Sequence, residues 1–181
     1  MILEFGTIRF SEIIFVNHYH PYFGPRFHND MGILGIVCIV STPDNQHFLM
    51  GRRAKKGEWH YNRWAMPGGL IETYTLRQGI ESAIMSEINE EILDDLNVSD
   101  PSIIAVSTGR LLLYFNFFVH LHVTSAVDFS ESLTSNYEFI NQRLEWKTYD
   151  EIRDMDDHDL FGGSKFIKHC WGDYLECLAS Q

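Results

Sequence analysis

Apolar residues recur along the chain with two different periods, and each period predicts a different kind of element. Five apolar runs have the composition of strands, and they lie at residues 32–40, 48–52, 103–108, 111–123 and 144–147. The turn residues Ser-Thr-Pro-Asp-Asn separate the first two runs, which are therefore expected to form a hairpin. Residues 8–16 predict a further strand, followed by a loop rich in His, Pro and Tyr at residues 18–30.

Between residues 76 and 96 the apolar period changes to four, which predicts a helix. One stripe contains Ile80, Ile84, Ile88, Ile92 and Leu96. Residues 166–178 place apolar side chains at spacings of one, three and four, as in an amphipathic terminal helix. Strands that flank a long helix, with a second helix at the end, predict an α/β (α+β) fold in which a mixed β-sheet is sandwiched between α-helices.

No repeat, low-complexity tract or Gly/Ser-rich linker divides the chain, so we expect one domain over residues 1–181. Its expected parts are an amino-terminal strand and loop at 1–31, a core at 32–152 and a carboxy-terminal helix at 153–181. Apolar residues make up 45% of the chain, which is enough to form a core without disulfides.

Charge and cysteine content narrow the functional class. The net charge of −11 should repel long nucleic acid, whereas a small phosphorylated ligand stays compatible if a bound cation reverses the local field. Cys38, Cys170 and Cys177 show no CxxC spacing and predict reduced thiols in a cytoplasmic protein. Neither a signal sequence nor an apolar run of membrane-spanning length is apparent, so we expect no membrane partner. His120 and His122, on one face of a predicted strand, are expected to be ordinary structural or surface histidines rather than metal ligands.

Three glutamates in the predicted helix carry candidate chemistry. Glu87, Glu90 and Glu91 are spaced i, i+3 and i+4, so their carboxylates project from neighbouring positions, largely opposite the isoleucine stripe. Such carboxylates repel one another, whereas a hard divalent cation such as Mg²⁺ or Mn²⁺ prefers carboxylate oxygens and keeps sites for water and substrate phosphates. The spacing alone does not require a metal, because acidic residues on the outer face of a helix are usually just solvated.

The loop before this helix changes that balance. Pro67-Gly68-Gly69 allows the backbone to approach a metal or phosphate closely, although the same tripeptide also forms ordinary turns. Residues 64–72 read WAMPGGLIE, and residues 86–91 read SEINEE. Together they resemble the Nudix box, G-x5-E-x7-R-E-U-x-E-E-x-G-U, preceded by the W-x-x-P-G-G-x-x-E sequence common in that family. The resemblance covers roughly residues 32–152 and implies the Nudix fold.

The chain departs from the box at four points. The loop after Gly69 is three residues longer, and Thr75 or Gln78 stands where the loop glutamate is expected. Ser86 replaces the arginine, and Leu93 replaces the late glycine, which should let the helix run on toward Leu96. In the family the arginine helps to orient the catalytic glutamates. Candidate substitutes for the missing polar groups are Glu72, Arg77 and Gln78.

The resemblance implies roles for individual residues. Glu87, Glu90 and Glu91 would bind the divalent metals, with the carbonyl of Gly68 as an additional ligand. Glu90 or Glu138 would be the general base.

A basic and aromatic cluster flanks the Pro-Gly-Gly loop. Arg52 and Arg63 are candidates for binding substrate phosphates, and Trp64 is a candidate for stacking on a nucleobase. Surface solvation and core packing are the alternatives for these residues.

The function implied by the resemblance is Mg²⁺- or Mn²⁺-dependent hydrolysis of a nucleoside diphosphate linked to another group, as in a pyrophosphohydrolase or a nucleotide-sugar hydrolase. The alternative is a non-catalytic Nudix-fold module that binds a nucleotide-like ligand or a protein partner, which Ser86 and the longer loop favour. Attack at carbon rather than phosphorus is a third reading. A homodimer formed through the aromatic-rich amino-terminal segment is compatible with each.

Overall fold

The computed structural model describes residues 33–55, 60–71, 79–92, 96–108, 114–124 and 131–179. The strand predicted at residues 8–16 and the loop predicted at 18–30 lie outside the described residues. The elements in chain order are β1 (Ile33–Ser41), β2 (His47–Arg52), β3 (Trp64–Ala65), α3 (Ile80–Glu91), β4 (Ser102–Thr108), β5 (Tyr114–His122), β6 (Leu133–Thr134), η2 (Ile140–Gln142), β7 (Arg143–Thr148), α4 (Tyr149–Asp154) and α5 (Gly163–Ala179).

The strands form one mixed sheet. Among the described residues the strand order is β4-β5-β1-β2-β7-β6, with β3 paired to β2 outside this path. β1 runs parallel to β5, from Ile33 opposite Tyr114 to Ser41 opposite His122, and the other strand pairs are antiparallel. The predicted hairpin is β1 with β2, and the long apolar strand β5 lies inside the sheet between β4 and β1.

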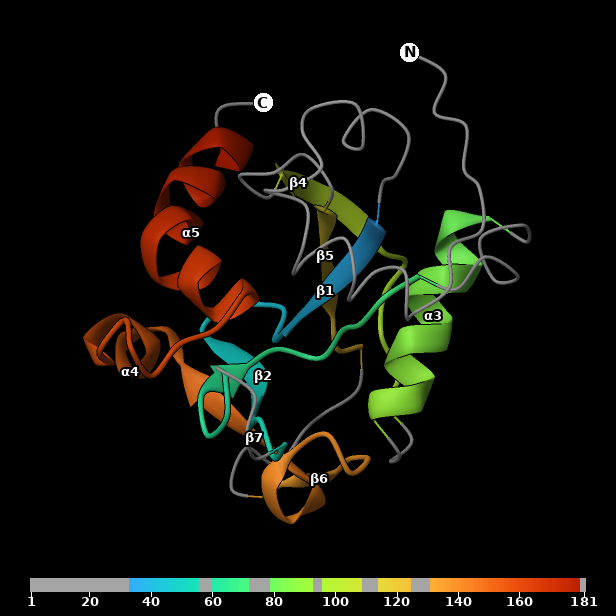
Figure 1. Cartoon of the computed structure of the whole chain (residues 1–181). Coiled ribbons are helices and arrows are strands. Elements are labelled where there is room, and N and C mark those ends of the chain that lie inside the picture. The colour runs from blue at the N-terminus through green and yellow to red at the C-terminus, as the bar shows by residue number, and fades with distance from the viewer. Residues whose placement is uncertain are drawn as a thin grey trace, which may run out of the picture.

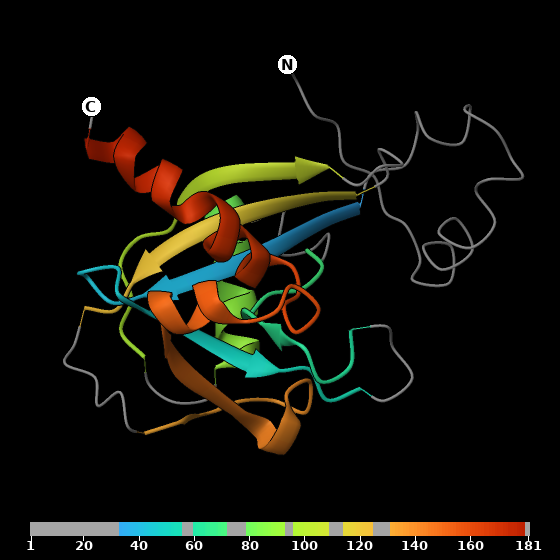
Figure 2. The same ribbon diagram turned by 90° about the vertical axis from the view of Figure 1, so that its left-hand side faces the viewer.

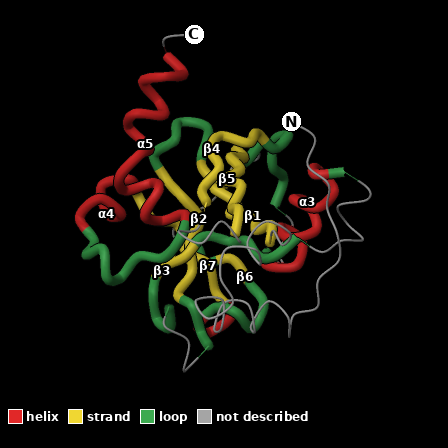
Figure 3. Tube along the Cα trace, turned by 45° about the horizontal axis from the view of Figure 1, so that its top comes forward, coloured by secondary structure: helices red, strands yellow, loops and turns green. Residues whose placement is uncertain are grey.

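Helices cover both faces of this sheet, with α3 on one face and α4 and α5 on the other (Figures 1 and 2). The sequence of β1 reflects this position, because Ile36, Cys38 and Val40 pack in the core under α3 while Val37 and Ile39 face α5. A strand covered on both faces is apolar at nearly every position. The predicted mixed sheet between helices is confirmed, and Figure 3 shows the same three layers.

Helix α3 ends earlier than the sequence predicted. The prediction that Leu93 would let the helix run on toward Leu96 is wrong, because the helix ends at Glu91. Ile92 is extended, with φ −112° and ψ 105°, and forms a β-bridge with Ser135. The local apolar pattern favoured a longer helix. The bridge to Ser135, more than forty positions away in the chain, ends the helix instead.

The short helix α4 directly follows β7. Its N-terminus has a capping box, in which the Glu151 N–H donates to Thr148 Oγ1 (3.1 Å) and the Thr148 N–H donates to Glu151 Oε2 (2.7 Å). The terminal helix α5 is confirmed but begins only at Gly163. Among the described residues, no helix is both long and apolar enough to cross a membrane.

Candidate active site

The Pro-Gly-Gly loop lies along β1 as an irregular extra strand. The carbonyl of Pro67 accepts a hydrogen bond from the Cys38 N–H (2.8 Å), and the carbonyl of Gly69 accepts one from the Ile36 N–H (2.9 Å). Gly68 lies between them with φ +144°, and a Cβ at this position would lie 2.2 Å from the carbonyl oxygen of Ile36. Only glycine fits this close approach of two backbones.

The side chain of Glu91 is turned inward toward this loop. The expectation that the glutamates lie largely opposite the isoleucine stripe is wrong for Glu91, which is buried on the same face as Ile84 and Ile88. The reason is helical spacing, because positions 84, 88 and 91 are separated by four and three residues. Inside, Glu91 Oε2 accepts a hydrogen bond from the N–H of Gly68.

Like charges gather around this buried carboxyl. The pKa of Glu91 is raised to about 8, chiefly by burial and further by the charges of Glu138 and Glu87, against the opposing effects of the Gly68 N–H and Arg53. The pKa of the Cys38 thiol is likewise raised by its burial and then by Glu91 and Glu87. Three carboxylates therefore share one small region with one guanidinium, and we call Glu87, Glu91, Glu138 and Arg53 the carboxylate cluster.

Glu138 belongs to a loop that is hydrogen-bonded to the last residue of α3. Ser135 Oγ donates to the carbonyl of Glu91, and the N–H of Glu138 donates to Asn136 Oδ1 (2.9 Å). Glu138 Oε2 lies 2.5 Å from Arg53 Nη2, and Glu91 Oε1 lies 3.8 Å from Arg53 Nη1. The structure thus brings Glu138 and Glu91 to the same basic side chain.

Glu87 and Glu90 point in different directions. The carboxylate of Glu87 lies against the loop, because a Cβ on Gly69 would be 2.4 Å from Glu87 Oε2. Glu90 is exposed, and its Oε1 accepts a hydrogen bond from Ser86 Oγ (3.1 Å). The predicted metal ligands are therefore not gathered as a closed set.

The donor chemistry of the cluster nevertheless fits a hard divalent cation. Carboxylate oxygens and a backbone carbonyl are the donors that Mg²⁺ and Mn²⁺ prefer, and the negative charges exceed the positive ones. Within the described ranges, no group of three or more His, Cys, Asp or Glu side chains is already arranged to hold a metal ion. Binding would therefore require the side chains of Glu87, Glu90 and Glu91 to converge.

Solved structures with this architecture cover most of the chain, whereas no family model and no curated protein matches it. The MutT protein of Methanosarcina mazei Go1 is 16% identical, with a TM-score of 0.56 over 83% of this chain and 97% of that one. A possible asymmetric diadenosine tetraphosphate hydrolase of Jonesia denitrificans gives 0.60 at 10% identity, covering 81% and 96%. The Nudix domain of Shewanella oneidensis NrtR, in complex with ADP-ribose, gives 0.54 at 13%, covering 88% and 97%. The chain has the Nudix fold.

In this Nudix fold, the residues predicted to bind substrate lie away from the carboxylate cluster. Trp64 is buried under α5, and the guanidinium of Arg52 lies 4.6 Å from the centre of its ring. Lys147 Nζ lies at the same distance from that ring. Arg63 Nη2 lies 3.4 Å from His158 Nδ1, beside the connection between α4 and α5. The structure does not bring Arg52, Arg63 or Trp64 together with the glutamates.

The basic residue at the site is Arg53, which sequence reasoning did not select. Side chains alternate between the two faces along a strand, and Leu49 and Gly51 face the core under α3 while Met50 faces the core under α5. Continuing that alternation places Arg52 on the α5 face and Arg53 on the α3 face. The period of two in β2 was the signal that could have distinguished these neighbouring arginines.

Proposed function

We propose that this protein is a hydrolase that uses Mg²⁺ or Mn²⁺ to cleave a nucleoside diphosphate linked to another group. The observation that carries the proposal is the carboxylate cluster, in which Glu91 is buried beside Glu87 and Glu138. Burying a carboxyl next to like charges opposes folding, and such arrangements concentrate at functional sites. Among proteins of similar fold, one is named a possible diadenosine tetraphosphate hydrolase and another was crystallised in complex with ADP-ribose. Both compounds contain nucleoside phosphates linked to another group.

Each residue has a role in this proposal. Glu87, Glu90 and Glu91, with the carbonyl of Gly68, would hold the cation. When bound, the cation neutralises charge on the diphosphate and lowers the pKa of a water molecule. Glu138 or Glu90 accepts the proton from the attacking water, and both are more accessible to solvent than Glu91.

A non-catalytic nucleotide-binding module is the second candidate, and the geometry at Ser86 favours it. Ser86 stands where the Nudix box has arginine, and its hydroxyl contacts only the exposed carboxylate of Glu90 among the described hydrogen bonds. A module of this kind would bind a nucleotide derivative and release it unchanged.

The test is a panel of nucleoside triphosphates, nucleotide sugars, ADP-ribose and dinucleotides, supplied with Mg²⁺ and then Mn²⁺. We expect metal-dependent turnover that falls by about 100-fold or more in Glu87→Gln. Glu81→Gln is the matched control, since Glu81 is an exposed residue in the first turn of the same helix and should behave as wild type.

The products also locate the bond that is attacked. A monophosphate or free phosphate indicates attack at phosphorus, whereas an intact diphosphate with a released sugar indicates attack at carbon. Binding of a panel member without turnover in either metal would refute the hydrolase and support the module.

A further inference from the structure

Helix α3 supplies no arginine to its own carboxylates, although the family's pattern places one at position 86. Ser86 provides a single hydroxyl, which donates to Glu90 Oε1 at 3.1 Å. A hydroxyl carries no charge and reaches one acceptor, whereas a guanidinium forms charge-assisted bonds to several. The basic residue that pairs with Glu91 therefore comes from another segment of the chain.

That partner comes from the end of β2, across the cluster from α3. Among the ion pairs of the described residues, Arg53 joins both Glu138, at 2.5 Å, and Glu91, at 3.8 Å. The side chain of Arg53 is only 14% exposed and that of Glu91 only 4%, so solvent screens the interaction weakly. One rigid guanidinium therefore contacts two carboxylates that would otherwise repel each other.

Arg53 is itself held in place by contacts that do not involve the carboxylates. Its N–H donates to the carbonyl of Arg63 (3.0 Å), and its own carbonyl accepts from the Asn62 N–H (2.8 Å). It forms a β-bridge with Phe139, and its guanidinium lies 5.4 Å from the centre of that ring. Because Phe139 follows Glu138 directly, the same bridge sets the relative positions of the arginine and one of its carboxylates.

We infer that Arg53, which directly follows β2, is a positioning residue that takes over the orienting role of the absent box arginine. It holds the carboxyl groups of Glu91 and Glu138 beside each other, while the Ser86 hydroxyl restrains Glu90. Earlier candidates for this role, Glu72, Arg77 and Gln78, lie outside the described residues. The inference rests on the proposed function. It identifies Arg53 as the residue that compensates for the missing arginine of the Nudix box.

The first readout is Mn²⁺ binding to the full chain without substrate, measured by titration calorimetry. We expect Arg53→Gln to weaken Mn²⁺ binding by about 10-fold or more, because Glu91 and Glu138 would lose the guanidinium that holds their side chains beside each other. Arg153→Gln is the matched control, since Arg153 is exposed and pairs only with the surface residues Asp150 and Asp154 in the described ion pairs. If Arg53 were a mere countercharge, its removal would leave Mn²⁺ binding unchanged or make it tighter, and either result would overturn the inference.

The second readout is turnover of the substrate found with the panel. In Arg53→Gln, kcat should fall by about 100-fold while KM changes less than about threefold, because a positioning residue acts on the reacting groups rather than on substrate binding. Arg53→Lys and the double variant Arg53→Gln/Ser86→Arg should each recover part of the lost kcat. A change confined to KM would mean that Arg53 binds substrate phosphate instead, and would overturn the positioning role.

The two proposals fail in distinguishable ways. A wild-type protein that binds Mn²⁺ but turns over no substrate would refute the hydrolase, while the Mn²⁺ affinity of Arg53→Gln would still decide the inference. Circular dichroism and the unfolding midpoint of each variant establish that the compared proteins are folded. Recovery by Ser86→Arg, on a different element, would show directly that the two positions serve one purpose.

Discussion

Glu91 is buried under α3 and His120 is buried under α5, on opposite faces of the sheet. Glu91 is 3% exposed and His120 is 4% exposed, and burial drives both toward the neutral form. The pKa of Glu91 is raised to about 8, whereas the pKa of His120 is lowered to about 4, by burial and then by His122. The two side chains are almost equally inaccessible to solvent, and their neighbours are of different kinds.

The described neighbours of His120 are a hydroxyl, aromatic rings and one other histidine, His122. Ser41 Oγ lies 2.8 Å from His120 Nε2, and the ring of Trp171 lies edge-on at 4.9 Å. Glu91, by contrast, shares its region with two further carboxylates and one guanidinium. A shifted pKa therefore marks a candidate site here only where several carboxylates are packed together.

The largest expected effect is on the α3 face, in Glu91→Gln. Turnover should fall by about 100- to 1,000-fold, because the neutral amide removes a proposed metal ligand. The fold should survive, since the Gln oxygen can still accept from the Gly68 N–H. Steady-state kinetics on protein of known unfolding midpoint measures both. Near-normal turnover in the folded variant would remove Glu91 from the site.

The matching change on the α5 face, His120→Ala, should act on stability instead. It leaves the hydroxyl of Ser41 without this partner and opens space beside Trp171, which together should cost about 2–3 kcal/mol. Urea unfolding measures the loss, and turnover per folded molecule should be unchanged. His169→Ala, at an exposed position, is the control; equal stabilities of the two variants would argue that His120 contributes no packing.

Stability should depend on pH in opposite directions for the two groups in metal-free buffer. Between pH 4.5 and about 8 the unfolded chain ionises Glu91 while the folded chain keeps it protonated, so this contribution is lost as pH rises. Between pH 6.5 and about 4 the unfolded chain protonates His120 while the folded chain does not, so this contribution is lost as pH falls. Each tenfold difference in proton affinity corresponds to roughly 1.4 kcal/mol, so both effects should reach a few kcal/mol.

Urea unfolding at a series of pH values checks this prediction with two variants. Glu91→Gln should gain stability relative to wild type as pH rises above 4.5, and His120→Gln should lose less stability than wild type below pH 6.5. Parallel curves for wild type and either variant would show that the substituted residue does not titrate differently in the folded and unfolded chain.

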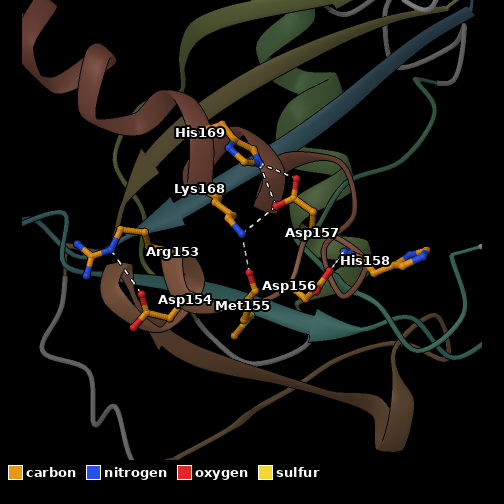
Figure 4. Close-up of polar contacts among 8 residues, drawn as sticks. All are labelled: Arg153, Asp154, Met155, Asp156, Asp157, His158, Lys168 and His169. Atoms are coloured by element: carbon orange, nitrogen blue, oxygen red, sulfur yellow. Dashed lines mark hydrogen bonds and ion pairs between the residues drawn. The ribbon is translucent and has the colours of Figure 1, made fainter.

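The smallest effect is expected where charges meet on the surface between α4 and α5. Asp157 contacts Lys168 at 2.8 Å and His169 at 3.0 Å (Figure 4), and the hydrogen bond from Lys168 chiefly lowers its pKa. Asp157 and His169 are exposed and the paired charges are of opposite sign, so solvent and salt screen the interaction. Asp157→Asn should leave the thermal unfolding midpoint at pH 7 equal to that of wild type within measurement error. A clear drop would show that exposure alone does not distinguish these surface charges from the carboxylate cluster.

Periodicity predicted most of the elements, because the apolar residues that a strand or a helix buries recur at a characteristic spacing along the sequence. The apolar runs of β1 and β5, the fourfold stripe of α3 and the amphipathic pattern of α5 were each legible in this way. The end of α3 was not, because it depends on the bridge between Ile92 and Ser135. Helix α4 was missed as a helix, although its capping residues Thr148 and Glu151 were readable.

Spacing and the resemblance to the Nudix box identified the candidates for chemistry in advance, namely Glu87, Glu90, Glu91, Gly68 and Glu138. Which of these residues lie together depends on the fold. Arg52 and Arg53 are adjacent and chemically identical, and the pairing of β2 within the sheet sends one to each face. Burial of Glu91 likewise depends on the loop of Gly68 and the strand of Arg53, which lie far from it in the chain. Local spacing specifies a periodicity, whereas faces, burial and charge partners arise from contacts between distant segments.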